Sequence, residues 1–176
     1  QAKTLFPYTT LFRSEVGSFR ATRMFASAGL ILCRSTGVAR RRALFDLDDG
    51  RYATFTEHDL APGSHVEYHM TGPTGEEAHG YWDIVEVDPP RRLVFVDGFA
   101  GSDGTPDDSF PHNEGRVTIE PIGAGRTLMS IESHFPSTQA MEQVLGMGME
   151  EGLTQAVGQI DAILAEDAVE PGGSAR

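Results

Sequence analysis

Between residues 53 and 135, apolar and polar positions alternate along the chain with the two-residue period of a β-strand. In Ser64–Thr71, the side chains of Val66, Tyr68 and Met70 share one face, and the other face is charged or carries imidazoles. This pattern is typical of a half-buried antiparallel strand. We expect six strands, bounded by Gly- and Pro-rich turns, at 53–60, 64–71, 76–87, 93–99, 116–122 and 126–135.

After Pro136 the apolar spacing changes to that of a helix. Ser137 or Thr138 is a candidate N-cap. The spacing predicts one long helix over 138–166, with Leu145 on its buried side together with Met141, Met149 and Ile160. Six strands followed by one helix predict an α+β fold, in which a curved antiparallel sheet wraps around the C-terminal helix. Residues 169–176 are expected to form a disordered tail.

Four glycines lie inside the predicted helix, where each costs up to about 1 kcal/mol relative to alanine. They are Gly146, Gly148, Gly152 and Gly158. Close packing of the helix on the sheet is one explanation. The other is that small residues leave room for a ligand between helix and sheet, with the neighbouring methionines as an adaptable apolar wall.

The first 45 residues differ in charge from the rest of the chain. They contain eight basic groups and one acidic group, whereas residues 46–176 contain six basic and twenty-five acidic groups. Thr4–Ser14 reads TLFPYTTLFRS, which resembles the translation of a common short-read sequencing adapter. We therefore expect residues 1–45 to be artefactual or disordered and to contact the sheet little. The alternative is a divergent basic arm.

The composition indicates which partners and which cellular location to expect for the protein. The chain has 176 residues, enough for one domain, and a net charge of -12, which disfavours nucleic acid and an anionic membrane surface as partners. Cys33 is the only cysteine, so no disulfide forms within the chain. The apolar run before it has about ten residues, is followed by several arginines and has no small-residue cleavage site, so we expect neither an export signal nor a membrane span. Thirteen arginines against one lysine suggest a GC-rich genome, and we expect a bacterial, cytoplasmic protein.

Two groups of polar side chains are candidates for a metal site or a catalytic site. His65, Glu67 and His69 share a strand face and could bind a metal with help from His58 or His79, although a solvated outer face explains them as well. Glu132 and His134 could act as an acid–base pair or simply be exposed. No nucleophilic triad or reactive cysteine is evident. We therefore assign no catalytic residue, metal or cofactor, and enzymatic activity is less favoured than binding.

Five segments carry a family resemblance: FTEHDLAPG (55–63), WDIVEVDPPRRLVF (82–95), VTIEPIGAGRT (117–127), FPS (135–137) and GMEEGL (148–153). Together they resemble the SRPBCC (START-like) superfamily, and within it the type named after the activator of heat-shock-protein ATPase. The resemblance implies a helix-grip fold: one strand, two small helices, six strands and a long C-terminal helix. The matching domain would be a partial one over 46–168.

The chain departs from the family pattern before residue 53. The Trp-Trp-Gly-Pro segment of the family is missing, and LFDLDDGRY (44–52) stands in its place. We therefore expect the first strand and the two small helices to be missing or corrupted. In the family the first strand pairs with the last, so the strand 126–135 is expected to have an unpaired edge.

The resemblance also implies an apolar cavity between sheet and helix that binds a small hydrophobic molecule. The side chains expected to line it are Tyr68, Trp82, Phe95, Phe99, Met129, Ile131, Met149 and Leu153. A filled core is the alternative to the cavity. Alternative functions are a cyclase- or dehydratase-like enzyme and a chaperone-linked stress-response module. A buried carboxylate or histidine with a shifted pKa would favour catalysis, and a purely apolar lining would favour binding. The sequence leaves the oligomeric state open.

Overall fold

A computed structural model of the protein describes residues 10–13, 17–25, 50–57 and 59–169. This part of the chain contains eight strands followed by two helices. The strands are β1 (Thr10–Arg13), β2 (Ser18–Phe25), β3 (Tyr52–Glu57), β4 (His65–Thr71), β5 (Glu77–Asp88), β6 (Arg92–Ala100), β7 (Asn113–Gly123) and β8 (Arg126–His134). The helices are α3 (Thr138–Gly146) and α4 (Met149–Val169).

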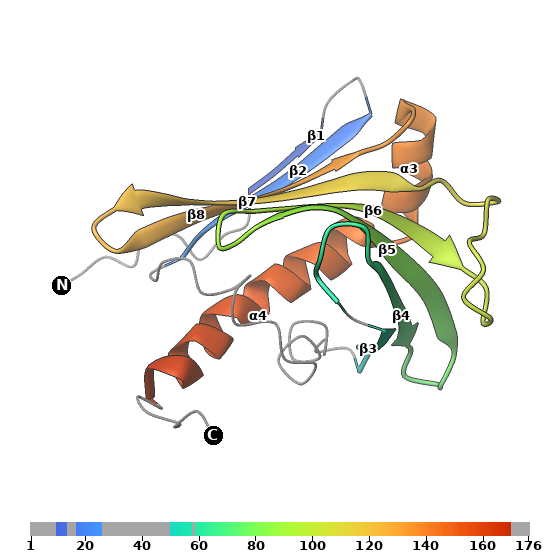
Figure 1. The fold of residues 1–176 in the computed structure, drawn as a ribbon, viewed down its shortest axis with the longest axis horizontal. Coiled ribbons are helices and arrows are strands. Elements are labelled where there is room, and N and C mark those ends of the chain that lie inside the picture. Colours follow the sequence, from blue (N-terminus) through green and yellow to red (C-terminus); the bar gives the residue numbers. More distant parts are fainter. Residues whose placement is uncertain (1–9, 14–16, 26–49, 58, 170–176) are drawn as a thin grey trace.

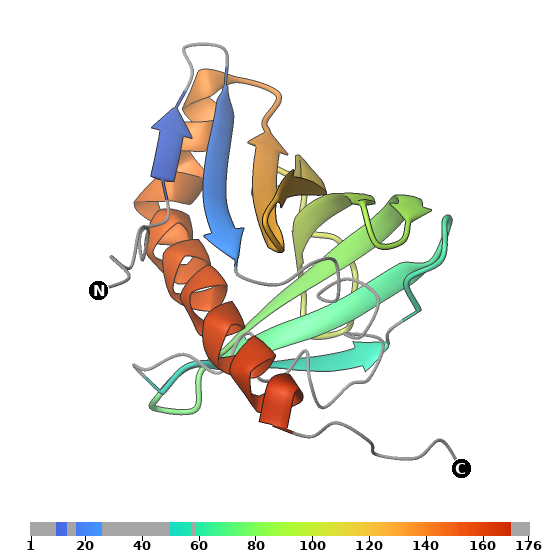
Figure 2. The same ribbon diagram turned by 90° about the vertical axis from the view of Figure 1, so that its left-hand side faces the viewer.

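The strands form one antiparallel sheet in the order β1-β2-β8-β7-β6-β5-β4-β3. The sheet is curved, and α4 crosses its concave face (Figures 1 and 2). Strands β3 to β8 correspond to the six strands predicted from the alternating pattern, so the α+β helix-grip fold is confirmed. Within the described residues, no helix is both long enough and apolar enough to cross a membrane.

Strand β2 completes the sheet at the edge where a free strand was expected. It pairs with β8 along its whole length, from Ser18 opposite His134 to Phe25 opposite Thr127. Phe19 is fully buried and Ala21 nearly so. The expectation of an unpaired β8 edge is therefore wrong, as is the expectation that residues 18–25 contact the sheet little. The two small helices of the family would fall within 26–49, outside the described residues.

The single predicted helix is in fact two helices, α3 and α4. Its N-cap is Ser137, as predicted, and the hydroxyl of Ser137 accepts a hydrogen bond from the backbone N–H of Ala140 at 3.1 Å. The first helix ends where the backbone N–H of Gly148 donates to the carbonyl of Leu145, and Gly148 has a φ of 93°, which favours glycine. Met141 and Ile160 are buried as expected, whereas Leu145 and Met149 are only partly buried, contrary to expectation.

The helix glycines at positions 146, 148 and 152 are not explained by close packing. Within the part of the chain that the structure describes, a Cβ added at any of the three would meet no heavy atom of another element within 4 Å. Their environment is therefore open, and the close-packing explanation is wrong for these three residues.

The core consists of two clusters, one on each half of the concave face. Cluster 1 lies under α4 and contains Val66, Ile84, Phe95, Val117, Ile119, Met129, Val157 and Ile160, together with Ala53, Phe55 and Leu93. Cluster 2 lies under α3 and contains Phe19, Ala21, Phe135, Ala140, Met141 and Val144. Leu153, near the start of α4, packs against both. The break between α3 and α4 lets each helix cover its own half of the sheet.

A β-bulge in β5 changes which of its residues face the core. The register between β5 and β6 shifts between Ile84 and Glu86. Val87 therefore packs against the core on the same side as Ile84, whereas strict alternation from Ile84 would place it on the opposite side with Val85. Val85 remains 53% exposed. An inserted residue moves every later side chain of the strand to the opposite face, and this explains why Val87 does not follow simple alternation.

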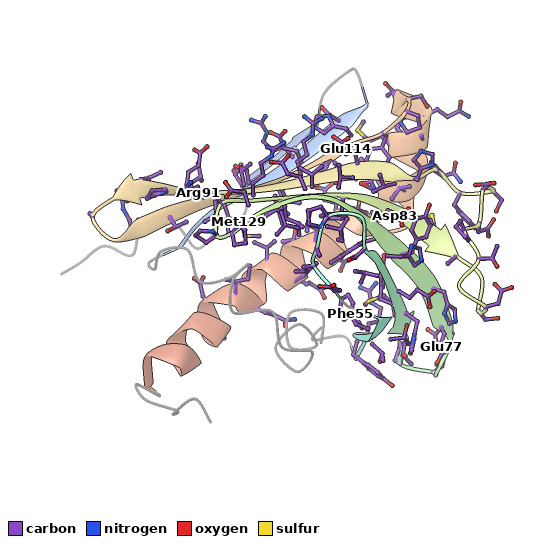
Figure 3. All side chains as sticks on the ribbon, viewed as in Figure 1. Phe55, Glu77, Asp83, Arg91, Glu114 and Met129 are labelled. Atoms are coloured by element: carbon purple, nitrogen blue, oxygen red, sulfur yellow. The ribbon has the colours of Figure 1, made fainter. Side chains whose placement is uncertain are left out.

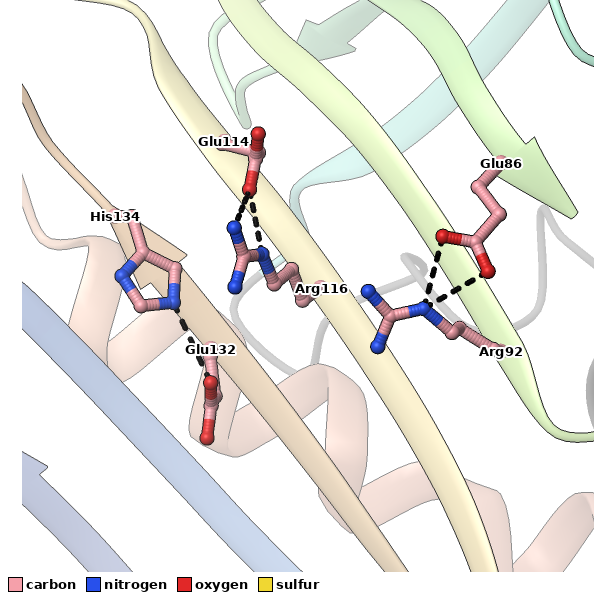
Figure 4. A network of polar contacts seen from close by, with 6 residues as sticks. All are labelled: Glu86, Arg92, Glu114, Arg116, Glu132 and His134. Carbon is pink, nitrogen blue, oxygen red and sulfur yellow. Dashed lines mark hydrogen bonds and ion pairs between the residues drawn. The ribbon is translucent and has the colours of Figure 1, made fainter.

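The convex face of the sheet is polar. Figure 3 places Glu114 on this outer face and Met129 between the sheet and α4. Three ion pairs run across it (Figure 4): Glu86 with Arg92, Glu114 with Arg116, and Glu132 with His134. Arg20 of β2 also pairs with Glu132. Glu132 and His134 therefore lie on the outer surface, in agreement with the alternative that they are simply exposed.

Candidate functional site

On the concave face, Asp97 of β6 is an ionisable acid that lies among apolar side chains of the described strands. Its Oδ1 accepts hydrogen bonds from Tyr68 Oη at 3.1 Å and from Trp82 Nε1 at 2.9 Å. Its Oδ2 accepts a hydrogen bond from Asn113 Nδ2 at 3.3 Å. The four residues come from four adjacent strands, β4, β5, β6 and β7. We call them the Asp97 cluster.

The register of the sheet brings these side chains together. Trp82 lies directly opposite Asp97 in the β5–β6 pair. Tyr68 lies opposite Gly80, and a Cβ at Gly80 would come within 2.6 Å of the tyrosine ring. The ring therefore lies across the bare backbone of Gly80, and its hydroxyl reaches past β5 to Asp97. Any larger residue at position 80 would displace the ring.

Aromatic rings border the Asp97 cluster on the side of β3 to β6. The ring centroids of Phe55 and Tyr68 are 5.7 Å apart, and those of Phe55 and Trp82 are 5.8 Å apart. Tyr68 and Trp82 are separated by 5.7 Å, and Trp82 and Phe95 by 4.7 Å. These distances are typical of interacting aromatic pairs. The carboxylate thus lies at the edge of a group of four rings.

Burial dominates the electrostatics of this cluster. Asp97 is partly exposed, and the neighbouring protein atoms remove much of the hydration of its carboxyl group. The loss of hydration raises the pKa of Asp97 from 3.8 to about 6, although its three hydrogen bonds act in the opposite direction. Burial, followed by the charge of Asp97, raises the pKa of Tyr68 well above 10.0. Asp97 is therefore a carboxyl group that titrates near neutral pH.

The structure separates the eight predicted lining residues into groups. Tyr68, Trp82 and Phe95 gather around Asp97. Phe99 and Met149 pack against cluster 2, and Leu153 lies between the clusters. Met129 and Ile131 of β8 pack in cluster 1. All eight therefore lie on the helix side of the sheet, but only three of them reach the polar cluster.

Asp97 and Asn113 were not among the site residues predicted from the sequence. The signal for Asp97 was present, because it alternates with Leu93, Phe95 and Phe99 and so shares their inward face. Asn113 precedes the strand predicted over 116–122, whereas β7 already begins at Asn113 and that residue is only 5% exposed. An acidic residue at an inward position of an apolar strand is the pattern that would have identified this site.

The histidines of β4 and β5 lie on the outer face and pair with acidic residues. His65 Nδ1 is 2.6 Å from Asp83 Oδ1, and His79 Nε2 is 3.4 Å from Glu77 Oε2. His69 Nε2 is 3.7 Å from Glu77 Oε1. In the described ranges, no three His, Cys, Asp or Glu side chains converge in a way that could hold a metal ion. His58, which the metal hypothesis also invoked, lies outside them.

Comparisons with known proteins point to one family. A family model described as "Activator of Hsp90 ATPase homolog 1-like protein" matches residues 48–165. A crystal structure of a Mycobacterium smegmatis protein is 30% identical with a TM-score of 0.80, covering 96% of this chain and 100% of its own. A solution NMR structure of an Arthrobacter aurescens protein is 32% identical with a TM-score of 0.81, covering 95% and 98%.

A more distant structure extends the likeness of fold. The crystal structure of the AHSA1 protein from Silicibacter pomeroyi is 18% identical with a TM-score of 0.65, covering 86% of this chain and 99% of its own. Among curated proteins, none matches the chain.

Proposed function

The chain belongs to the Activator of Hsp90 ATPase homolog 1-like family, and on this premise we propose that it binds a small apolar molecule between the concave face of the sheet and α4. The observation that carries the proposal is the partial exposure of side chains that face the helix. Of the eight predicted lining residues, only Phe95 and Met129 are buried. Apolar surface left open on a concave face favours a ligand.

The position of Leu153 supports the same proposal. It lies where the two core clusters meet, and it remains partly exposed there. Next to it, a Cβ at Gly152 would have no neighbour within 4 Å among the described residues. The junction between α3, α4 and the sheet is the place where we expect an apolar molecule to bind.

An NMR titration tests this proposal. The neutral probe 4-phenylbutan-1-ol should shift the backbone signal of Leu153 and the indole signal of Trp82, which is the only tryptophan. Signals of Glu132 and Arg116 on the outer face serve as the internal control. A probe at one hundred times its dissociation constant should stabilise the protein by about 2.7 kcal/mol. Shifts confined to the outer face, or no shifts at all, would contradict the proposal.

Asp97 supports a second candidate, a cyclase- or dehydratase-like enzyme. A carboxyl group with a pKa of about 6 can both release and accept a proton near neutral pH. Turnover distinguishes the two candidates. Recovery of a bound molecule unchanged favours binding, and its chemical conversion by the wild type but not by Asp97→Asn favours an enzyme.

Two further expectations stay predictions. A role as a chaperone-linked module rests on the family description alone, and an assay of Hsp90 ATPase stimulation would test it. A cytoplasmic location in a bacterium rests on composition, and fractionation of cells would test it.

A further inference from the structure

We propose that the ligand of this concave face is an organic cation, a protonated amine on an apolar body, and that its ammonium group binds Asp97. This inference rests on the proposed function and adds the chemical class of the ligand. It follows from three properties of the Asp97 cluster: an unfilled acceptor position, donors that are all neutral, and the adjacent aromatic rings.

The first property is the hydrogen-bond balance of the carboxylate. An ionised carboxylate has about four acceptor positions. Oδ1 of Asp97 receives two hydrogen bonds, but Oδ2 receives only the long one from Asn113. A further donor can therefore bind at Oδ2 without displacing Tyr68 or Trp82. Asp97 also keeps part of its surface accessible, so a ligand can reach it.

The second property is that the three groups donating hydrogen bonds to Asp97 carry no charge. Arg20, Arg92 and Arg116 each pair with a glutamate on the outer face instead. A buried anion without a cation is costly, and an ammonium group would provide both the charge and the missing donor. A carboxylate ligand would be repelled at the same place.

The third property is the group of four rings beside the carboxylate. Phe55, Tyr68, Trp82 and Phe95 form a chain of contacts with centroid distances between 4.7 and 5.8 Å. An ammonium group within about 6 Å of an aromatic face is attracted by it, most strongly by tryptophan. The same rings offer apolar surface to the body of the ligand. A carboxylate beside aromatic rings thus matches an amine better than an alcohol of the same shape.

The pH dependence of amine binding should follow Asp97 alone. Tyr68 is the titratable side chain in contact with it, and its raised pKa keeps it neutral below pH 10. Trp82 of β5, Asn113 of β7 and Phe55 of β3 carry no charge, and Asp83 and Tyr81 of β5 lie on the outer face with His65. The residues of α4 that pack on cluster 1 are apolar: Leu153, Val157 and Ile160. Between pH 8 and pH 5, protonation of Asp97 should weaken amine binding about tenfold.

The test compares three probes that share one apolar body. They are 4-phenylbutylamine, 4-phenylbutan-1-ol and 4-phenylbutanoate, and binding is followed at pH 8 by the fluorescence of Trp82. We expect the amine to bind at least about tenfold more tightly than the alcohol, and the carboxylate to bind most weakly. Asp97→Asn should weaken amine binding by about 10- to 100-fold and leave alcohol binding within about threefold. Asp83→Asn, on the outer face of the neighbouring strand, is the matched control and should change neither.

The outcomes separate the two proposals. Equal binding of amine and alcohol, or amine binding that survives Asp97→Asn, would overturn this inference while the binding function stands. Binding of none of the probes to the wild type would overturn both. Loss of alcohol binding in Asp97→Asn would also overturn the inference, because Asp97 would then hold the shape of the site rather than recognise a charge.

Discussion

Replacing Asp97 with asparagine should make the protein more stable at neutral pH. In the folded protein, burial raises the pKa of Asp97 from 3.8 to about 6. At pH 7 the group is therefore ionised in an environment that disfavours its charge. Asparagine has nearly the same shape and carries no charge, so the substitution removes this cost.

The pKa values set the magnitude and the sign of the effect. Because the pKa is raised on folding, the folded state holds the proton more tightly than the unfolded state between pH 3.8 and 6. The stability due to protonated Asp97 is fully present below pH 3.8 and is lost as the pH rises through 6. At 1.36 kcal/mol per pKa unit, the whole change is about 3 kcal/mol.

Hydrogen bonding reduces the expected gain. In Asp97→Asn, the amide oxygen can keep the hydrogen bonds from Tyr68 and Trp82. The new amide nitrogen then faces the side-chain nitrogen of Asn113, so the Asn113 amide must rotate to present its oxygen. We therefore expect a net gain of about 1–2 kcal/mol at pH 7.5, after a cost comparable to one hydrogen bond.

Urea unfolding of the wild type, Asp97→Asn and Asp83→Asn from pH 4 to pH 8 measures this effect. The difference between Asp97→Asn and the wild type should grow with pH and level off above pH 7. Asp83 is 55% exposed and lies on the outer face, so its variant should show no comparable trend. A difference that stays constant from pH 4 to pH 8 would refute the claim that the charge of Asp97 is buried at a cost.

Three further predictions concern local structure. Ser137→Ala should cost about 1 kcal/mol of stability by removing the N-cap of α3, and a loss below measurement error in urea unfolding would argue against the cap. Ala124→Asn should stabilise the β7–β8 hairpin by about 0.5–1 kcal/mol, because Ala124 has a φ of 52° that asparagine tolerates better; a lower melting temperature would contradict this. Gly80→Ala should push the Tyr68 ring away from Asp97 and change the fluorescence of Trp82, whereas the control Gly152→Ala should stabilise α4 by up to about 1 kcal/mol. An unchanged Trp82 spectrum in Gly80→Ala would show that Tyr68 is placed by other contacts.

Much of the candidate site was predictable, but its central residue was not recognised. Tyr68 and Trp82 were both among the residues expected to line the space between sheet and helix, and both pack on that side of the sheet. The alternating pattern also contained Asp97, two residues after Phe95 on the same face. What the pattern could not provide was the set of donors, because Tyr68 and Asp97 come from strands that are separated by β5. The role of a polar residue on an apolar face depends on hydrogen-bond partners that are distant in the sequence.

The sequence by itself determined the local elements of this protein. Six strands, the turns between them, the Ser137 cap and the polar outer face all follow from short-range spacing and residue type, because side chains repeat every two residues in a strand. The tertiary structure decided the rest. The pairing of β2 with β8, the bulge after Ile84 and the break at Gly148 depend on how the two core clusters are covered. The burial of Asp97 likewise depends on the neighbouring strands and on α4, and burial is the physical cause of its raised pKa.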